Sequence, residues 1–361
     1  MALFMSNRQL SQQKKRLEDA FRRYGIEGED AFYAVAYQYL ICSGPTRHVA
    51  SERIKAKGEK VLERAKGDKY LTSLLSAIIG SDRNRENLPV WYQHFLGRRF
   101  RESSGKFFTP HSIARAMAEL LPVKDNAVIM DPACGGGTFL IEASKRWAGF
   151  SCLLVANDVE SSLVDLTEAV LAMATPQNHE KYLLASNIYE PCASFREWFG
   201  KVDYILANPP FSLKINAIEV ESRLFSLGYR NSDALFLDIC FSLLRPNGRL
   251  VCLLPHSIVA NADYQGLRAA VEESWNLLGV IGMPEGVFHL TASTTTRADI
   301  VMLEKFGPLS QPTRKTVFAF APSVGVPLNS RMKNPGRNYL QEIVKDEEFI
   351  AALRIEENVL L

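Results

Sequence analysis

The sequence predicts an α/β protein, in which a parallel sheet of seven strands is flanked by helices and preceded by a helical segment. Two observations support this class. From about residue 127 onward, short apolar runs typical of buried strands alternate with amphipathic helical patterns. Two of these runs end in rigid or glycine-rich turns with polar side chains, and the carboxyl ends of strands are where open α/β sheets place their chemistry.

The first 104 residues show helical patterns. Asp30 and Asp68 each precede a run of apolar residues at helical spacing, and Pro89 opens a third helix. This segment has 19 Lys and Arg against 12 Asp and Glu, a net charge of +7, whereas the remaining residues have −5. We expect a basic helical domain over residues 1–104 that contacts phosphate groups or a partner subunit; a solvated helical face is the alternative for any single basic cluster.

Strands and helices then alternate along the chain. Strands are expected at 127–131, 152–158, 183–186, 202–207, 249–254, 277–282 and 299–304. Helical patterns at 138–148, 160–174, 233–244 and 263–275 separate most of them. These elements predict one α/β domain over residues 105–310, followed by a C-terminal extension over residues 311–361.

A glycine-rich turn follows the first strand, with the sequence D-P-A-C-G-G-G-T-F over residues 131–139. Three consecutive glycines let the backbone pass close under a ligand, because no Cβ stands in the way. The turn lacks the lysine of a phosphate loop and the G-x-G-x-x-G spacing of a dinucleotide site. An acid ahead of the glycines suits a zwitterionic or cationic ligand better than a pyrophosphate.

The tetrapeptide Asn208-Pro209-Pro210-Phe211 follows the fourth strand. Its prolines fix φ and remove two backbone donors, so the turn presents carbonyl acceptors and the Asn208 amide in a stiff frame. A planar amino group lying over Phe211 would donate both N–H bonds to these acceptors, which draws its nitrogen toward a nucleophilic shape. A tight structural turn is the alternative, but the glycine-rich turn upstream favours a site where an exocyclic amine attacks.

Taken in order, these motifs resemble the N6-adenine DNA methyltransferases that use S-adenosylmethionine, specifically the modification subunit of type I restriction–modification systems. The resemblance runs from about Gly105 to about Lys345. It includes Gly105–Pro110, which resembles a Phe-x-Thr-Pro motif at the methionine end of the cofactor, Arg245–Pro255, and Gly282–Phe288, which resembles a segment that closes over the target base. The order of the motifs is the γ arrangement of such enzymes.

The resemblance implies a Rossmann-like methyltransferase domain of seven strands that methylates N6 of a flipped-out adenine in DNA. Asn208, Pro209, Pro210 and Phe211 would form the catalytic motif. Phe211 and Phe288 would stack on the target base, with core packing as the alternative for Phe288. No general base is evident, and none is needed before attack because the N6 proton can leave to water. His256 is expected to be structural or a loop contact.

The resemblance also implies the contacts of S-adenosylmethionine. Asp158, at the end of the second strand, would accept hydrogen bonds from ribose hydroxyls, and a helix N-cap is the alternative. Asn187 replaces an aspartate that the family uses near this place, but keeps a carbonyl acceptor for the adenine amino group. The complete expected set is Phe108, Thr109, Pro110, Asp131, Ala133, Gly135, Gly137, Thr138, Phe139, Asp158 and Asn187.

Composition argues against a membrane protein and a metalloprotein. No apolar run reaches membrane-spanning length, and the start lacks the apolar core of a signal peptide. The six cysteines form no CxxC pair and the six histidines no HExxH motif, so we expect no metal, reduced thiols and a cytoplasmic protein. Cys134 is expected to be a small packing residue.

About 55 residues follow Phe306, which is too few for the target-recognition domain of stand-alone γ enzymes. The resemblance therefore implies DNA and a separate specificity subunit as partners, with a restriction subunit as a further possible component. Two other classes remain open. One is methylation of protein glutamine or of a guanine amino group in ribosomal RNA, and the other is a non-catalytic scaffold that binds the cofactor or DNA.

Overall fold

The computed structural model describes residues 7–42, 52–81, 88–89, 91–92, 94–96, 108–176, 178–288, 297–307, 315–329, 332 and 336–353. The expected helix from Pro89 lies only partly within them, and Gly105–Phe107 of the Thr-Pro motif lie outside. The chain divides into two compact units, which we call the helical unit (Met1–Ser103 with Ser161–Gln177) and the sheet unit (Ser104–Glu160 with Asn178–Leu361).

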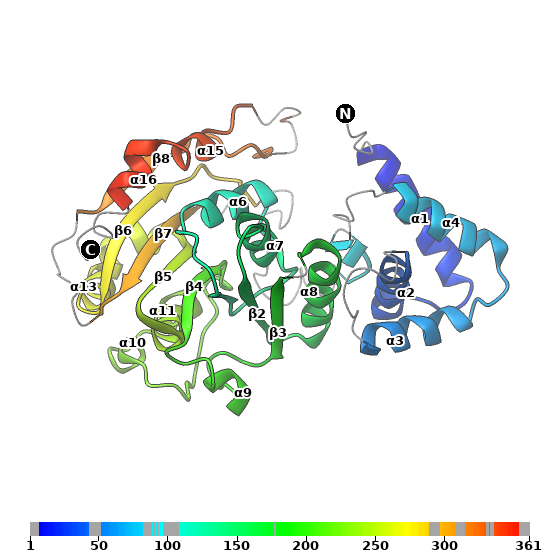
Figure 1. Cartoon of the computed structure of the whole chain (residues 1–361), viewed down its shortest axis with the longest axis horizontal. Coiled ribbons are helices and arrows are strands. Elements are labelled where there is room, and N and C mark those ends of the chain that lie inside the picture. The colour runs from blue at the N-terminus through cyan, green and yellow to red at the C-terminus, as the bar shows by residue number, and fades with distance from the viewer. Residues whose placement is uncertain are drawn as a thin grey trace. The chain divides into compact units, whose positions relative to one another are not determined.

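The helical unit contains α1 (Asn7–Arg22), α2 (Gly28–Ile41), α3 (Glu52–Glu63), α4 (Lys69–Ser81) and α8 (Ser161–Ala174) (Figure 1). Asp68, which precedes this helix as the sequence indicated, caps α4, because its Oδ1 accepts hydrogen bonds from the backbone of Tyr70 at 2.8 Å and Leu71 at 3.0 Å. Asp30 does not cap α2. That helix begins two residues earlier, with Glu27 as N-cap, so Asp30 lies in the first turn, where the helix dipole still favours an acid.

A buried carboxylate explains why α8 belongs to the helical unit. The side chain of Asp165 on α8 is 1% exposed, accepts a hydrogen bond from the Tyr33 hydroxyl of α2, and pairs with Arg53 of α3. Lys57 lies 3.7 Å from the same carboxylate. A buried charge is costly unless it is paired. The helix itself matches the pattern at 160–174, but periodicity does not show partners 112 and 132 residues away.

The sheet unit is built on eight strands in the order β3-β2-β1-β4-β5-β7-β6-β8 (Figure 1). Strand β7 runs antiparallel to its neighbours β5 and β6, and all other pairs are parallel. The strands are β1 (Ala127–Asp131), β2 (Cys152–Asp158), β3 (His179–Ala185), β4 (Val202–Ala207), β5 (Leu244–Pro255), β6 (Trp275–Gly282), β7 (Ala298–Lys305) and β8 (Val317–Phe320).

All seven expected strands are present, but the sheet has eight strands in the described residues instead of seven, and β7 departs from the expected parallel arrangement. The additional strand β8 spans four residues at the sheet edge, and Phe318 and Phe320 are 70% and 56% exposed. So short a run without a buried face has no pattern that distinguishes it from a loop. Whether β7 runs parallel or antiparallel depends on how it pairs with β5 and β6, and the periodicity of side chains within one strand does not indicate this.

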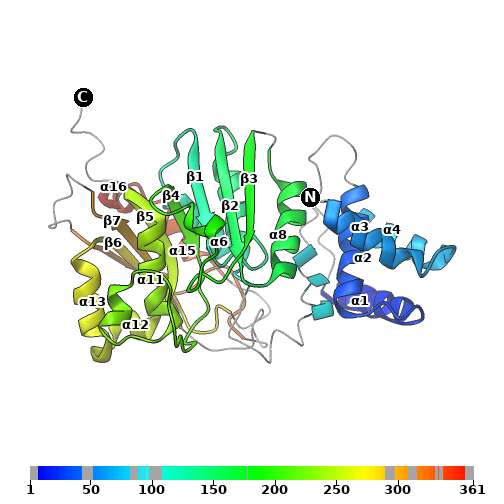
Figure 2. The same cartoon turned by 90° about the horizontal axis from the view of Figure 1, so that it is seen from below.

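Helices cover both faces of the sheet. In its described residues the sheet unit contains the helices α6 (His111–Glu119), α7 (Thr138–Arg146), α9 (Ala193–Arg196), α10 (Arg223–Ser226), α11 (Ser232–Leu243), α12 (His256–Ala260), the 3₁₀ helix η1 (Ala262–Tyr264), α13 (Gln265–Glu272), α15 (Tyr339–Ile343) and α16 (Glu347–Leu353). Figure 2 shows α11 beside β5 and α13 beside β6, and these pairs are in contact.

On β4, Tyr204 meets Trp147 at the end of α7 with ring centroids 5.7 Å apart, whereas Ile205 joins the core cluster of α11. A central strand buried on both faces explains the unbroken apolar run of residues 204–207.

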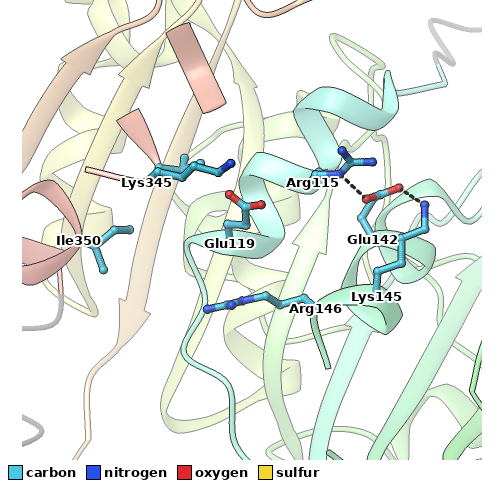
Figure 3. Close-up of a pocket in the computed structure, with 8 residues that line it drawn as sticks. Arg115, Glu119, Glu142, Lys145, Arg146, Lys345 and Ile350 are labelled. Atoms are coloured by element: carbon cyan, nitrogen blue, oxygen red, sulfur yellow. Dashed lines mark hydrogen bonds and ion pairs between the residues drawn. The ribbon is translucent and has the colours of Figure 1, made fainter. Parts of the chain in front are cut away.

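Glu142 holds α6 and α7 together (Figure 3). Its side chain is 1% exposed, and its Oε1 lies 2.8 Å from both His111 Nδ1 and Lys145 Nζ, while Arg115 Nε donates to Oε2 at 3.1 Å. Burial by itself would raise the pKa of Glu142, but these three partners outweigh it and lower the pKa to about 2. The carboxylate is therefore charged throughout the neutral range.

We predict that Glu142→Gln destabilises the protein by roughly 1–2 kcal/mol at neutral pH. A pKa lowered from 4.5 to about 2 corresponds to about 3 kcal/mol, and the half-exposed partners reduce that value by solvent screening. A depressed pKa contributes stability that is present above pH 4.5 and is lost as the pH falls toward 2, so the difference between the proteins should vanish over that window. Thermal melts at a series of pH values measure it.

Glu342→Gln is the matched control, because that glutamate forms an exposed pair with Arg337 and the same substitution should change stability little. Identical pH dependence in wild type and Glu142→Gln would show that the three partners do not stabilise the carboxylate.

Candidate functional site

The site lies at the sheet edge where β2, β1 and β4 end side by side. These three strands are neighbours and run parallel, so the residues that follow them meet at one edge. Asp131 ends β1, Asp158 ends β2, and Asn208 directly follows β4. The structure thus brings the glycine-rich turn, the second-strand acid and the Asn-Pro-Pro-Phe turn together, as the sequence predicts.

The glycine-rich turn is held by the two residues that end β2. The backbone N–H of Gly135 donates to Asp158 Oδ2 at 3.1 Å, and the Asn157 side chain donates to the carbonyl of Pro132 at 2.9 Å. Gly135 and Gly137 have φ of +52° and +76°, which other residues rarely adopt. A Cβ added at Gly135 would meet no atom within 4 Å. The turn is therefore a fixed backbone cradle with open space above it.

Asp131 lies beneath this cradle and is fully buried. Its Oδ1 accepts a hydrogen bond from the backbone of Ala133 at 3.1 Å, and its Oδ2 has no hydrogen-bond partner among the described residues. Burial raises the pKa of Asp131 well above the ordinary range, and the nearby charge of Asp158 raises it further. A cationic ligand group would relieve both effects, so the surroundings of Asp131 suit a positively charged ligand better than an anion. Thr138 and Phe139, also expected here, are buried at the start of α7.

Asn208 contacts the Thr-Pro motif directly. Its Nδ2 donates to the hydroxyl of Thr109 at 3.2 Å, although the two residues are 99 positions apart. Thr109 is buried, and the next residue, Pro110, is the N-cap of α6, while Phe108 is half-buried. The bond fixes the orientation of the amide, because a nitrogen directed at Thr109 places the carbonyl oxygen on the opposite side.

The Asn-Pro-Pro-Phe turn is braced from α11. Ser232 Oγ donates to the carbonyl of Pro210 at 2.6 Å and accepts from the backbone of Leu213 at 3.1 Å. Ser212, directly after Phe211, has a φ of +58°, an uncommon conformation for a residue with a side chain. The hydrogen bonds of Ser232 thus fix the conformation of the turn relative to α11.

Phe211 and Phe288 meet edge to face, with ring centroids 6.5 Å apart and planes at 80°. Phe211 is 7% exposed and Phe288 is fully buried. In this structure Phe288 thus packs in the core, the alternative noted above. Its contact with a base stays a prediction and would require the ring to become accessible.

Asn187 lies in a turn after β3. Its Oδ1 accepts from the backbone of Tyr189 at 3.1 Å, and its Nδ2 lies 3.3 Å from Glu190 Oε2. A carbonyl oxygen has two lone pairs, so Oδ1 can accept a second hydrogen bond. The adenine contact expected of Asn187 stays a prediction.

Three residues of the site escaped the sequence analysis. Asn157 is fully buried and ties the glycine-rich turn to Ser186 after β3, at 3.0 Å. A polar residue inside the apolar run of β2 could have indicated it. Ser232 lies in an Asn-Ser-Asp stretch that looks like an ordinary helix start. Val159 is 58% exposed beside Asp158, and an exposed branched side chain after the ribose acid would suit an apolar face of a ligand.

Among the described residues, no group of three or more His, Cys, Asp and Glu side chains could hold a metal ion. No helix in the same residues is long and apolar enough to cross a membrane. Cys134 is buried in the glycine-rich turn, consistent with a packing role.

Comparison with known proteins agrees with this geometry. The sequence matches the N-6 DNA Methylase family over residues 87–338. It is 29% identical to the type II methyltransferase M.VspI of a Vibrio species over 62% of this chain and 54% of that protein. It is 25% identical to the EcoEI methylase subunit of Escherichia coli over 60% of this chain and 45% of that protein.

A type I restriction–modification methyltransferase subunit from Streptococcus thermophilus has the same fold, with a TM-score of 0.59 and 19% identity over 82% of this chain and 64% of that one. The chain spans about half the length of these two curated relatives. The family match covers well over half of the chain and includes every motif at the carboxyl edge of the sheet. The chain therefore belongs to the N-6 DNA Methylase family.

Proposed function

We propose that this protein transfers the methyl group of S-adenosylmethionine to N6 of a flipped-out adenine in DNA, as the modification subunit of a restriction–modification system. The hydrogen bond between Asn208 and Thr109 is the observation that supports this most strongly. It joins the Thr-Pro motif to the catalytic turn at the edge where the glycine-rich cradle lies.

The residues present fit the cofactor. S-adenosylmethionine supplies an activated methyl group on a positively charged sulfur. In this proposal Gly135 and Gly137 let the backbone approach it, and the buried Asp131 pairs with its cationic amino end. Asp158 Oδ2 accepts a hydrogen bond from the backbone of Gly135 in the glycine-rich turn, and Oδ1 accepts one from the backbone of Glu160. Each carboxylate oxygen has two lone pairs, so in this proposal Asp158 also accepts from the ribose hydroxyls.

The catalytic turn would act by positioning. Asn208 Oδ1 accepts one N–H of the adenine amine, and the rigid turn aligns the nitrogen with the methyl group. Phe211 stacks on the base, which contributes roughly 1–3 kcal/mol. The base must first leave the duplex, because the amine cannot reach such a site while it is stacked and paired.

We further propose residues 1–104 as the basic helical domain, 105–310 as the catalytic domain and 311–361 as an extension. Of the cations in residues 1–104, Arg53 and Lys57 pair with Asp165 of α8, and Arg64 pairs with Asp30. Phosphate contacts would then come from exposed cations such as Lys15, Arg16, Lys66 and Lys69.

Gly135→Val should abolish measurable binding of S-adenosylmethionine. The branched side chain would occupy the open space above the cradle, and a φ of +52° is strained for valine. Isothermal calorimetry measures binding and circular dichroism checks the fold. Gly149→Ala is the control, since a Cβ there also meets no atom and φ is not left-handed. Undiminished affinity in a folded Gly135→Val protein would refute the cofactor site.

Asn208→Ala should lower the methylation rate by roughly 100-fold or more, the usual effect of losing one preorganised transition-state hydrogen bond. Cofactor binding should survive, because the glycine-rich turn is held by hydrogen bonds with Asp131, Asn157 and Asp158, which the substitution leaves in place. Mass spectrometry of N6-methyladenine in plasmid DNA measures the rate. Parallel assays on ribosomal RNA and on protein test the other substrate classes. A near wild-type rate of DNA methylation in Asn208→Ala would contradict the proposed role of the Asn208 amide.

The chain alone should methylate DNA poorly, and a specificity subunit should direct it to a defined site. Phosphate contacts supply affinity but no sequence information. We expect weak, strongly salt-dependent DNA binding by the isolated chain, and tight binding with site-specific methylation after the partner is added. Sequencing-based mapping of N6-methyladenine tests this. Efficient methylation of one sequence motif by the chain alone would show that these 361 residues recognise the site unaided.

A further inference from the structure

A histidine–carboxylate pair lies at the same sheet edge as the catalytic turn. Nδ1 of His256 is 2.7 Å from Oδ2 of Asp299. The Asp299 side chain is 2% exposed, whereas the His256 side chain is 36% exposed. The backbone of His256 also donates to the carbonyl of Arg297 at 3.0 Å. The Asp299 carboxylate is thus held in the protein interior, whereas the His256 imidazole remains accessible.

Strand order and register place this pair at the same sheet edge as Asn208, after the neighbouring strand. Strand β5 runs parallel to β4 with Cys252 opposite Ala207, so His256 lies just beyond the end of β5 at the catalytic edge. Strand β7 is antiparallel, which brings its first residues to that edge, with Asp299 opposite Leu254. The contact between Phe211, after β4, and Phe288, after β6, spans the ends of β5 and β7. His256 therefore follows β5, one of the two strands that lie between these segments.

The pair fixes the chemistry of the imidazole. A carboxylate only accepts hydrogen bonds, so the Nδ1 of His256 is the donor. The neutral ring then has its lone pair on Nε2, as a proton acceptor requires. A further charged group lies at the pair, since Arg297 Nε is 3.8 Å from Asp299 Oδ1.

We propose that His256 accepts the proton released by the target amine during methyl transfer, an inference that rests on the function proposed above. The amine nitrogen forms its bond to the methyl carbon while the carbon–sulfur bond breaks and its electron pair goes to sulfur. The N6 proton moves to Nε2 of His256, which then passes it to water. Asp299 is a positioning residue that holds the tautomer. This assignment replaces the expectation that His256 is only structural and that water takes the proton directly.

The tautomer can be tested without cofactor or DNA. In ¹⁵N-labelled protein, two-dimensional imidazole spectra distinguish Nδ1–H from Nε2–H, and the His256 resonances are those lost in His256→Asn. We expect the Nδ1–H form in the wild type. In Asp299→Asn the amide can donate to Nδ1, so the Nε2–H form should grow. A wild-type ring protonated mainly on Nε2 when neutral would overturn the proposal.

Kinetics test the proton transfer. In His256→Asn, the asparagine can donate to Asp299 from nearly the position of Nδ1, but it cannot accept the proton. The single-turnover methylation rate should therefore fall by about 100-fold, the lower end of the range for general bases. Cofactor affinity should not change. Added imidazole should restore part of the rate in His256→Ala. His111→Asn is the control, because His111 also pairs through Nδ1 with a buried carboxylate and its variant should show no imidazole rescue.

The outcomes separate the two proposals. Suppose that the wild-type protein methylates adenine and that folded His256→Asn does so at an undiminished rate. This result would overturn the role of His256 and leave the proposed function intact. A folded His256→Ala protein that imidazole does not rescue would likewise exclude a proton-accepting role. Absence of adenine methylation in the wild type, alone and with a specificity subunit, would refute the function itself and this inference with it.

Discussion

Parallel pairing of β2, β1 and β4 is the constraint on which the site depends. It brings three chain-distant carboxyl termini to one edge, so that Asp158, Asp131 and Asn208 lie together. Short hydrogen bonds then set the fine geometry, from Asp158 and Asn157 to the glycine-rich turn and from Asn208 to Thr109. None of these contacts could form if the strands paired in a different order.

Buried carboxylates have different roles in this protein, and the role of each depends on the charge of the groups that contact it. Glu142 and Asp165 are nearly inaccessible but have cationic partners, and each joins helices within its unit. Asp131 is equally buried with one backbone donor from Ala133, and its pKa is raised. A paired carboxylate stabilises structure, whereas one whose charge is poorly compensated is suited to a ligand that brings the missing positive charge.

Sequence reasoning succeeded where the local pattern and the global structure agree. The two turns follow buried strands in the structure, Asp68 caps its helix, and the strands at 127–131, 152–158 and 202–207 have the expected bounds. It failed where another part of the chain decides the outcome. Strand β8 exists because β6 offers a partner, and α8 groups with the N-terminal helices because Asp165 pairs with Arg53.

The sequence by itself determined the residue types of the site, because glycines, prolines and an amide at the ends of apolar runs restrict the backbone locally. The family resemblance rests on those same motifs. Only the tertiary structure decided that Asn208 meets Thr109, that Phe288 is buried against Phe211, and that His256 pairs with Asp299. Each of these contacts joins residues far apart in the chain, so it depends on strand order and direction, which no local pattern specifies.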